Sequence, residues 1–419
     1  MNPSRTRALS TPTDPEDAVG APDLVRAEAR LARFRPTFAV IDLGRLAHNF
    51  RTLAARVGGD VAQIPVVKAD GYGHGSIPVA QRLAAEGAHA FGVALVEEGV
   101  ELRRAGLRGP ILLLGILTPG QIPSALDHDL IPAVFEPSLL ARLEEEGRAR
   151  GRRLVVNVKI DTGMGRLGFP LEEQDGLVRR LAASRGLELA GVFTTFSTAD
   201  DPHSPETARQ IDRLDAFVSR LSAAGLGPGL VHAANSAAIL SHPRGWKSAV
   251  RPGLALYGLH PGQKVDRADL RPVLAFETEV IQVRHVPEGG TVGYGGAWRA
   301  ARASRVAILP VGYADGWPRA LSNRGPVLFD GGAGIVAGRV SMDLTAVDVT
   351  GLQGVETGAP ATLIGERGGA ALTATDLAEA TGTIAYEVLC GIGRRVPRVY
   401  VEAGRVVDFI DPFAGSDRP

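Results

Sequence analysis

The sequence predicts an α/β protein, with an N-terminal (β/α)8, TIM-like barrel followed by a C-terminal, mainly β domain. Between residue 37 and about residue 260, apolar runs of strand length alternate with amphipathic helical patterns. Eight such strand–helix units fit a closed barrel. The main rival, a doubly wound open sheet, is disfavoured because no GxGxxG turn occurs early in the chain. After residue 271 short β runs and glycine-rich turns take over, which predicts the second domain.

The barrel strands are expected at residues 64–68, 90–94, 110–114, 131–135, 154–160, 189–193, 229–232 and 249–251. Helical patterns lie between them at residues 77–86, 96–105, 137–150, 171–183 and 207–223. In the second domain, β runs are expected at 275–286, 305–311, 326–329, 334–340 and 344–349, with a helix at 374–381. We therefore expect a disordered tail over 1–35, a barrel over 36–270 and a β domain over 271–419. The strand pattern at 37–42 could also join the β domain.

The composition limits the classes of function. Among 419 residues, 46 basic side chains balance 46 acidic ones, so nothing favours nucleic acid or an anionic membrane surface as a partner. The single cysteine, Cys390, excludes an intramolecular disulfide and a cysteine-cluster metal site. No apolar run approaches the roughly 20 residues that span a bilayer, and the N-terminus has no signal peptide pattern. We expect a cytoplasmic protein that binds no metal, membrane or nucleic acid.

One lysine stands out as a candidate reactive group. Residues 66–75 (VVKADGYGHG) place Lys68 at the end of an expected strand, before a glycine-rich turn. A desolvated lysine amine can condense with a carbonyl group. The chain has only three other lysines, Lys159, Lys247 and Lys264, and the last two lie in polar, loop-like surroundings. The competing interpretation is an ordinary solvated residue at a strand end.

Other polar segments also follow expected strands directly, at 159–166, 194–200, 232–236 and 251–258. In a (β/α)8 barrel these strand ends meet on one face. Arg166 could bind a carboxylate through two parallel hydrogen bonds, or pair with a structural acid. Asn235 and Ser236 stand where a helix is expected to begin. The N–H groups of that helix could bind phosphate, or the two residues could simply cap the helix. In the second domain, residues 291–296 (TVGYGG) expose Tyr294 between glycines.

Taken together, these motifs resemble the alanine racemase family of fold-type III pyridoxal-5′-phosphate (PLP) enzymes. VVKADGYGHG is similar to the PLP-lysine motif of the family. KIDTGMGRLG, RPGLALYG, GYADG, GRVSMD and AYEVLCGIGRRVPR follow in the family's order, and the resemblance covers residues 37–402. It implies a homodimeric, PLP-dependent isomerase that interconverts L-alanine and D-alanine with two bases and supplies D-alanine for cell-wall peptidoglycan.

The resemblance also implies residue roles. Lys68 would bind PLP covalently and act as one base, while Tyr294 would act as the second base, in the site of the partner subunit. The other residues implied to bind the cofactor are Tyr72, Asn235, Ser236, Arg251, Gly253, Leu254 and Tyr386. Those implied to bind the substrate are Arg166, Met342 and Tyr313. Lys159 matches a family position that is often carbamylated.

Two positions depart from the family pattern. Thr195 stands where the family usually has a histidine that backs the PLP ring, and Ser341 stands where many relatives have cysteine. A broader-specificity or serine racemase is therefore the alternative function. A non-catalytic PLP carrier built on the same barrel would lack the second domain and Tyr294. A fold-type III decarboxylase is disfavoured because Arg251 would face the ring nitrogen, where many PLP enzymes place a carboxylate.

Overall fold

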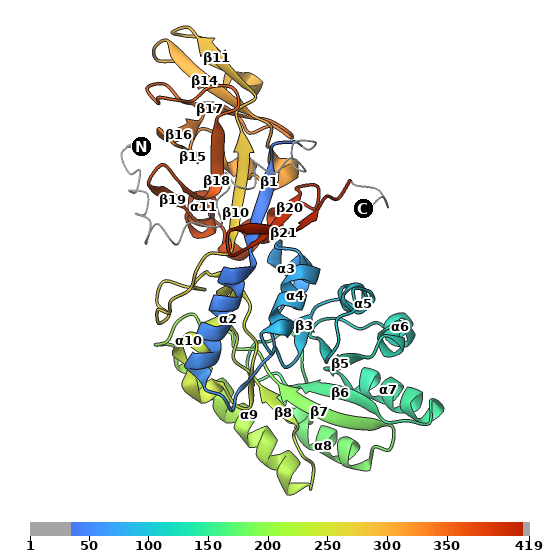
Figure 1. Cartoon of the computed structure of the whole chain (residues 1–419). Coiled ribbons are helices and arrows are strands. Elements are labelled where there is room, and N and C mark those ends of the chain that lie inside the picture. The colour runs from blue at the N-terminus through green and yellow to red at the C-terminus, as the bar shows by residue number, and fades with distance from the viewer. Residues whose placement is uncertain (1–34, 414–419) are drawn as a thin grey trace. The chain divides into compact units, whose positions relative to one another are not determined.

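The structure, a computed structural model, describes residues 35–413 (Figure 1). The chain divides into two compact units. The barrel unit comprises Leu46–Leu270, and the β unit comprises the described residues before and after it, 35–45 and 271–413. Apart from Arg35, the tail predicted over residues 1–35 lies outside the described residues.

The barrel unit contains eight parallel strands in the order β2-β9-β8-β7-β6-β5-β4-β3. The segment after β2 closes this sheet, because Val66 forms a parallel bridge with Gly92 of β3. The Val67 N–H also donates to the Gly92 carbonyl at 2.9 Å. The predicted barrel is confirmed. Its strands are β2 (Ala62–Gln63), β3 (Phe91–Val93), β4 (Ile111–Leu113), β5 (Leu130–Val134), β6 (Leu154–Lys159), β7 (Leu187–Phe193), β8 (Leu230–His232) and β9 (Ala249–Val250).

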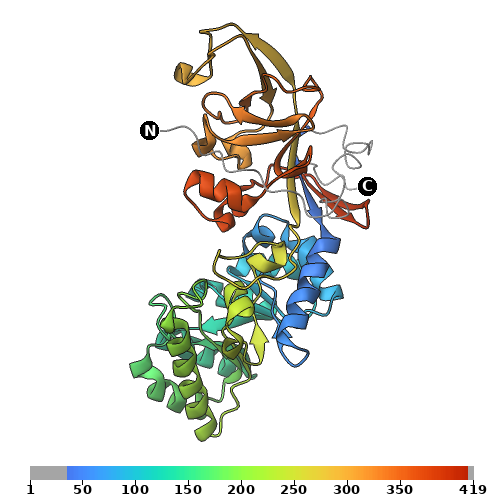
Figure 2. The same cartoon turned by 90° about the vertical axis from the view of Figure 1, so that its left-hand side faces the viewer.

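Helices alternate with these strands and are arranged around them (Figure 2). Helix α9 illustrates why they form, because Ile211, Leu214, Phe217 and Leu221 repeat at helical spacing and are all buried. The helices are α2 (Leu43–Val57), α3 (Lys68–Tyr72), α4 (Ser76–Ala85), α5 (Val96–Arg104), α6 (Ile122–Asp127), α7 (Pro137–Ala149), α8 (Gln174–Ala183), α9 (Pro205–Ala223) and α10 (Ser236–Ser241).

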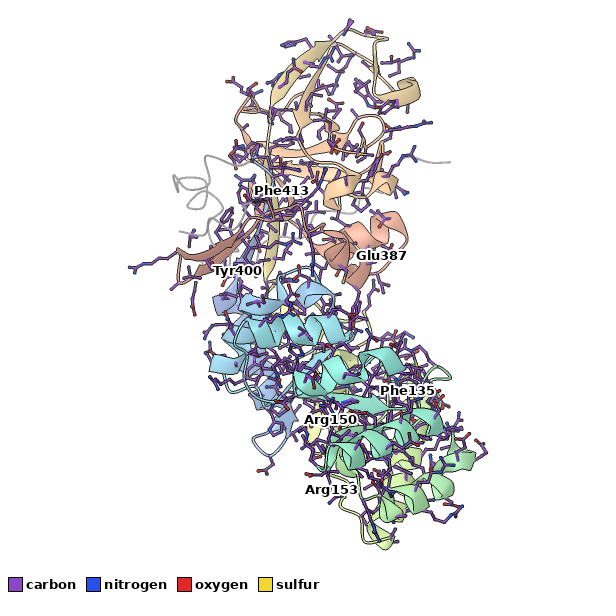
Figure 3. The ribbon with its side chains drawn as sticks, turned by 90° about the vertical axis from the view of Figure 1, so that its right-hand side faces the viewer. Phe135, Arg150, Arg153, Glu387, Tyr400 and Phe413 are labelled. Atoms are coloured by element: carbon purple, nitrogen blue, oxygen red, sulfur yellow. The ribbon has the colours of Figure 1, made fainter. Side chains whose placement is uncertain are left out.

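An ion-pair cluster joins the ends of two neighbouring helices of this unit. Arg150, which follows α7 and is labelled in Figure 3, donates to Glu146 at 2.6 Å and to Asp127 at 2.8 Å. Asp127 is the last residue of α6, so the guanidinium group connects α6 to α7. These pairs are partly exposed and contribute modestly to stability.

The β unit is built on an eleven-stranded sheet in the order β11-β14-β17-β16-β15-β18-β10-β1-β20-β21, with β19 paired to β18. Strands β12 and β13 form a separate pair. The predicted mainly β class is confirmed. The strands are β1 (Phe38–Asp42), β10 (Leu274–Glu279), β11 (Gln282–Val286), β12 (Thr291–Val292), β13 (Trp298–Arg299), β14 (Ser304–Leu309), β15 (Pro326–Phe329), β16 (Gly332–Val336), β17 (Thr345–Asp348), β18 (Pro360–Arg367), β19 (Ala370–Leu372), β20 (Arg398–Glu402) and β21 (Arg405–Ile410).

Strand β1 lies inside this sheet although it precedes the whole barrel unit in the chain. It pairs antiparallel with β10, where Phe38 is opposite Glu277, and parallel with β20, where Ala39 is opposite Arg398. Its Val40 packs in a core cluster with Ala275. The run expected at 275–286 divides into β10 and β11, which pair with different strands.

Two helices lie in the β unit, α11 (Ala374–Thr381) and α12 (Ala385–Gly391). The sequence predicted α11 with the same bounds, and its start is fixed by the Thr373 side chain, which accepts from the Asp376 N–H. Helix α12 was not predicted as a helix. Across residues 35–413, no helix is both long and apolar enough to cross a membrane. The same residues contain no group of three or more His, Cys, Asp or Glu side chains arranged to hold a metal ion.

Candidate active site

In the barrel unit, polar residues gather where the parallel strands end. Lys159 and His232 are the last residues of β6 and β8, Thr194 follows β7, and Arg251 follows β9. Hydrogen bonds connect three of these strand ends, because the guanidinium of Arg251 donates to the carbonyls of Thr194 and His232, each at 2.7 Å. The expected convergence on one face of the barrel therefore holds for these residues.

Lys68 begins a short turn with an unusual backbone. The next four residues, Ala69, Asp70, Gly71 and Tyr72, all have φ between 52° and 60°. Left-handed backbone costs about 1–2 kcal/mol per residue for side chains other than glycine, so other contacts must hold this turn. The side chain of Lys68 is exposed, which differs from the desolvated lysine assumed from the sequence. Among the described residues it makes no hydrogen bond or ion pair.

Hydrogen bonds that involve side chains fix the left-handed turn in addition to those of its own backbone. A carboxylate oxygen of Glu98, on α5, accepts from the Ala69 N–H at 2.7 Å. The Asp70 carboxylate accepts from the Ser76 N–H at the start of α4, at 3.0 Å. His74 is buried and its Nδ1 lies 3.0 Å from the Gly71 carbonyl. The predicted start of a helix just after this segment is confirmed by α4.

Arg251 is a buried cation whose hydrogen-bond partners are all neutral. Its NH1 donates to Nδ1 of His232 at 2.8 Å, and its NH2 donates to the carbonyl of Ala233 at 3.1 Å, in addition to the two carbonyls named above. Burial lowers the pKa of Arg251 to about 10, so the group stays protonated at neutral pH. Its Nε has no hydrogen-bond partner within the described part of the chain.

His232 is held as a neutral ring. Its Nε2 lies 3.3 Å from Oδ1 of Asn157, which can only accept, so the hydrogen-bond network assigns the proton to Nε2. Nδ1 is then free to accept from Arg251. Burial, together with the Arg251 charge, holds the pKa of His232 well below its ordinary value. The ring stacks on Phe193 with centroids 5.0 Å apart. His232 lies within a polar segment noted in the sequence, but the sequence predicted no role for it.

A second corner of the unit gathers hydroxyl groups around Gly253. The Ser236 hydroxyl accepts from the N–H groups of Gly253 at 2.9 Å and Ala255 at 3.1 Å. A Cβ at Gly253 would lie only 2.7 Å from the hydroxyl oxygen of Tyr72, so glycine permits this close approach. Leu254 begins a short 3-10 helix (Leu254–Tyr257). Asn235 caps α10, because its side chain accepts from the Ala238 N–H at 3.0 Å.

Lys159 lies in a cluster of positive charge. Its side chain is 3% exposed, and its ammonium lies 5.6 Å from the centre of the Phe193 ring. Burial, followed by the charges of Arg166 and Arg251, lowers the pKa of Lys159 to about 8. Lys68 contributes in the same direction. The sequence indicated Lys159 through its family position, and the structure adds that burial and neighbouring cations lower the pKa of its amine.

Arg166 is exposed and lies in the loop that follows β6. Asp161 holds this loop, because one of its oxygens accepts from the N–H groups of Gly163 and Met164, each at 2.9 Å. Burial acts to raise the pKa of Asp161, but the backbone donors lower it overall. Thr195, at the position that departs from the family pattern, accepts from the Gln210 amide at 3.0 Å through its carbonyl.

The remaining candidate residues belong to the β unit. Tyr294 is 71% exposed and follows Gly293 in the turn between β12 and β13. Tyr313 and Met342 are also exposed. The Tyr313 N–H donates to the Ser341 carbonyl at 3.0 Å, so these two neighbouring segments are in contact. Tyr386 is half-buried on α12.

A buried carboxylate supports the Tyr313 and Met342 segments. Asp315 accepts from the Gly312 N–H at 3.0 Å and from Nε of Arg395 at 2.7 Å. Arg395 also donates to Asp343, which follows Met342, at 2.7 Å. Sequence reasoning missed Asp315 and Arg395, although both lie within quoted motifs.

Comparison with known proteins gives two family matches that together span nearly all of the described chain. The family described as "Alanine racemase, N-terminal domain" matches residues 41–261, and "Alanine racemase, C-terminal domain" matches residues 273–400. The chain is also 45% identical over 367 residues to an alanine racemase of Symbiobacterium thermophilum, covering 87% of this chain and 97% of that protein.

Solved structures agree with these matches. An alanine racemase of Clostridium difficile 630 has a TM-score of 0.86 and 33% identity, covering 90% of this chain and 99% of that one. The alanine racemase of Bartonella henselae, solved with covalently bound pyridoxal phosphate, has a TM-score of 0.81 and 29% identity, covering 88% and 100%. Because the family matches extend over more than half of the chain, it belongs to the alanine racemase family.

Proposed function

We propose that this chain is an alanine racemase that interconverts L-alanine and D-alanine with PLP and two bases, Lys68 and Tyr294. The observation that carries the proposal is the group of strand-end residues in the barrel unit. There, Arg251 is buried and aimed by His232, and the hydroxyls of Ser236 and Tyr72 meet at Gly253. Family membership supplies the reaction type, and these residues supply a place for the cofactor.

The donors at Gly253 suit a phosphate group. Ser236 and Tyr72 offer hydroxyls, and Leu254 offers an N–H at the start of a 3-10 helix. We assign the phosphate of PLP to these groups, together with Asn235, Gly253 and Tyr386. Asn235 would act by fixing the start of α10, since its side chain is engaged as a cap. Covalent attachment of the cofactor would occur at Lys68.

Arg251 suits the ring nitrogen of PLP. NH1 and NH2 are occupied by fixed acceptors, which leaves Nε as the donor toward a ligand. A guanidinium group donates hydrogen bonds and accepts none, so it favours a ring nitrogen that carries no proton. When bound, PLP draws electrons from the substrate Cα and so weakens its C–H bond. Arg251 would moderate that effect and so favour reversible proton exchange over other outcomes.

Racemisation requires a proton donor and a proton acceptor on opposite faces of Cα. We assign Lys68 to one face and Tyr294 to the other. A phenol is a weak base, so the proposal requires positive charge near the substrate to assist Tyr294. Its exposure within its own chain supports a role in a partner's site, and hence a homodimer. The cytoplasmic location stays a prediction from the sequence.

For the substrate carboxylate we propose Arg166, assisted by Met342 and Tyr313. Lys159 would orient Arg166 after carbamylation. In that reaction the ammonium of Lys159 first loses one proton. The neutral amine then attacks CO2, an N–C bond forms and a second proton is released, so a cation becomes an anion. The pKa of about 8 supports this, because a neutral fraction of the amine exists near pH 7. An anion here would also offset the charges of Arg166 and Arg251.

The decisive experiment follows the Cα proton. Purified protein with PLP is incubated with L-alanine in D2O, and we expect D-alanine that carries deuterium at Cα. L-serine is tested in parallel, because Thr195 and Ser341 leave open a broader-specificity or serine racemase. Bound PLP without any exchange at Cα would contradict the proposal and favour a non-catalytic PLP carrier. Release of CO2 with loss of the amino acid would favour a decarboxylase.

A further inference from the structure

The side chain of Glu98 joins two segments of the barrel unit. Neither the sequence motifs nor the proposed residue roles include Glu98. It lies on α5, and its two carboxylate oxygens divide between two segments. One accepts from the Ala69 N–H at 2.7 Å. The other accepts from the N–H groups of Ala94 and Leu95, at 2.8 and 3.1 Å. A single carboxylate therefore joins the turn after Lys68 to the segment that follows β3.

We infer that Glu98 is a positioning residue for Lys68, and that it acts by holding the left-handed turn in place. This inference rests on the proposed function, in which Lys68 carries the cofactor. Ala69 is the residue next to Lys68 and has φ 52° and ψ 51°. An alanine adopts this conformation only when its surroundings impose it. The bond from its N–H to an ionised carboxylate supplies that constraint, since charged acceptors form stronger hydrogen bonds than neutral ones.

The direction of the Lys68 side chain depends on this turn. A side chain leaves the backbone along the Cα–Cβ bond, so rotation of the adjoining peptide redirects it. Val67, before Lys68, is fixed by its hydrogen bond to Gly92 of β3. Among described residues, the Lys68 side chain itself has no partner that would hold it. The peptide on its C-terminal side is fixed through Ala69 and Glu98. Loss of that bond would release one of the two restraints on the lysine.

Five proteins test the inference: the wild type, Glu98→Gln, Glu97→Gln, Ala69→Gly, and Glu98→Gln combined with Ala69→Gly. Glutamine keeps the size of Glu98 but cannot present two acceptor oxygens, so one set of N–H groups loses its partner. Glu97 is the matched control, because it lies one residue away on α5, is exposed and accepts from the Gln121 side chain instead. Glycine at position 69 adopts the left-handed conformation without the penalty of a Cβ.

We measure three quantities: the dissociation constant of PLP by absorbance titration of the apo protein, the kcat and KM for L-alanine, and amide hydrogen exchange of residues 66–76 in the apo protein. Glu98→Gln should weaken PLP binding by about 10- to 100-fold, lower kcat and speed exchange in this segment. Glu97→Gln should match the wild type. Ala69→Gly should recover most of the loss in the double variant, which a general loss of stability would not allow.

Three results would overturn the inference: unchanged PLP binding and exchange in Glu98→Gln, an equal loss in Glu97→Gln, or no recovery by Ala69→Gly. If Glu98→Gln does not fold, Glu98→Asp replaces it, because the shorter side chain keeps the charge but cannot span both segments. If the wild type does not bind PLP at Lys68, the proposed function fails. Hydrogen exchange in the apo protein then still decides whether Glu98 holds the turn.

Discussion

Arg251 and His232 of the barrel unit and Tyr294 and Met342 of the β unit are held in opposite ways. In the barrel unit, Arg251 and His232 are buried and bonded to fixed neighbours. In the β unit, Tyr294 and Met342 are exposed on turns and loops. Under our proposal, the fixed groups of the barrel unit form a preorganised place for a cofactor. Our proposal assigns Tyr294, which is exposed within its own chain, to the site of a partner subunit.

The largest effect is expected from Lys68→Ala, which tests the role proposed for the barrel unit. We expect loss of covalent PLP and a fall in racemisation of at least about 10^3-fold, because both the attachment point and one base disappear. Absorbance spectra and the rate of D-alanine formation measure the two losses. Lys264→Ala is the matched control, since Lys264 is an exposed lysine of the same unit paired with Asp201. A Lys68→Ala protein that keeps covalent PLP would refute the assignment.

The role proposed for the β unit is tested by Tyr294→Phe, which removes the hydroxyl and keeps the ring. We expect kcat to fall by about 10^2- to 10^4-fold, the range for loss of an acid–base group, with PLP binding unchanged. The matching experiment mixes this variant with Lys68→Ala under conditions that exchange subunits. If Tyr294 acts in a partner's site, mixed dimers contain one intact pair and regain activity. Two inactive parents that stay inactive after mixing would place both bases on one chain.

A smaller effect is expected at Gly253, where the backbone lies close to the Tyr72 hydroxyl. In Gly253→Ala, the new Cβ would meet the Tyr72 hydroxyl at 2.7 Å, so the corner assigned to phosphate must shift. We expect PLP binding to weaken by about tenfold, measured by titration of the apo protein. Gly227→Ala is the control, because a Cβ there meets nothing within 4 Å. Equal affinities in the two variants would argue against a tight phosphate corner.

A modest effect on stability is expected from the charge of Lys159. Its pKa of about 8 in the folded protein lies below the ordinary 10.5. Between these values the unfolded chain binds the proton and the folded chain does not, so stability should rise with pH from about 8 to 10.5. We expect no more than about 2 kcal/mol after screening by solvent. Urea unfolding of CO2-free protein across this range measures the rise, and Lys159→Met should remove it. A slope that survives in Lys159→Met would assign the proton to another group.

The sequence predicts those parts of this fold that depend on local patterns. Barrel strands such as β6 and the helix α11 lie close to their predicted bounds, because apolar periodicity and a threonine cap are encoded within a few residues. The division of residues 275–286 into two strands was missed. Only long-range pairing separates β10 from β11, since they contact different strands of the sheet.

For the candidate site, too, the sequence predicts what local patterns encode and misses what depends on long-range contacts. Lys68, Arg166 and Arg251 could be named from motifs, because their residue types and spacing carry the signal. A turn after Lys68 was expected, but its left-handed backbone was missed, because Ala69 and Tyr72 give no local sign of positive φ. Glu98 was missed for a related reason. It reaches the turn from a helix 29 residues further along the chain, and no spacing rule encodes that contact.

The position of β1 has a consequence for synthesis of the chain. This apolar strand (FAVID) leaves the ribosome before the whole barrel unit, yet its two partners, β10 and β20, emerge after it. The barrel unit can fold while β1 still lacks both neighbours, and the strand completes its pairing only when translation is nearly finished. During that interval an unpaired, apolar strand is open to wrong pairing with other chains, which is the period when a chaperone would protect it.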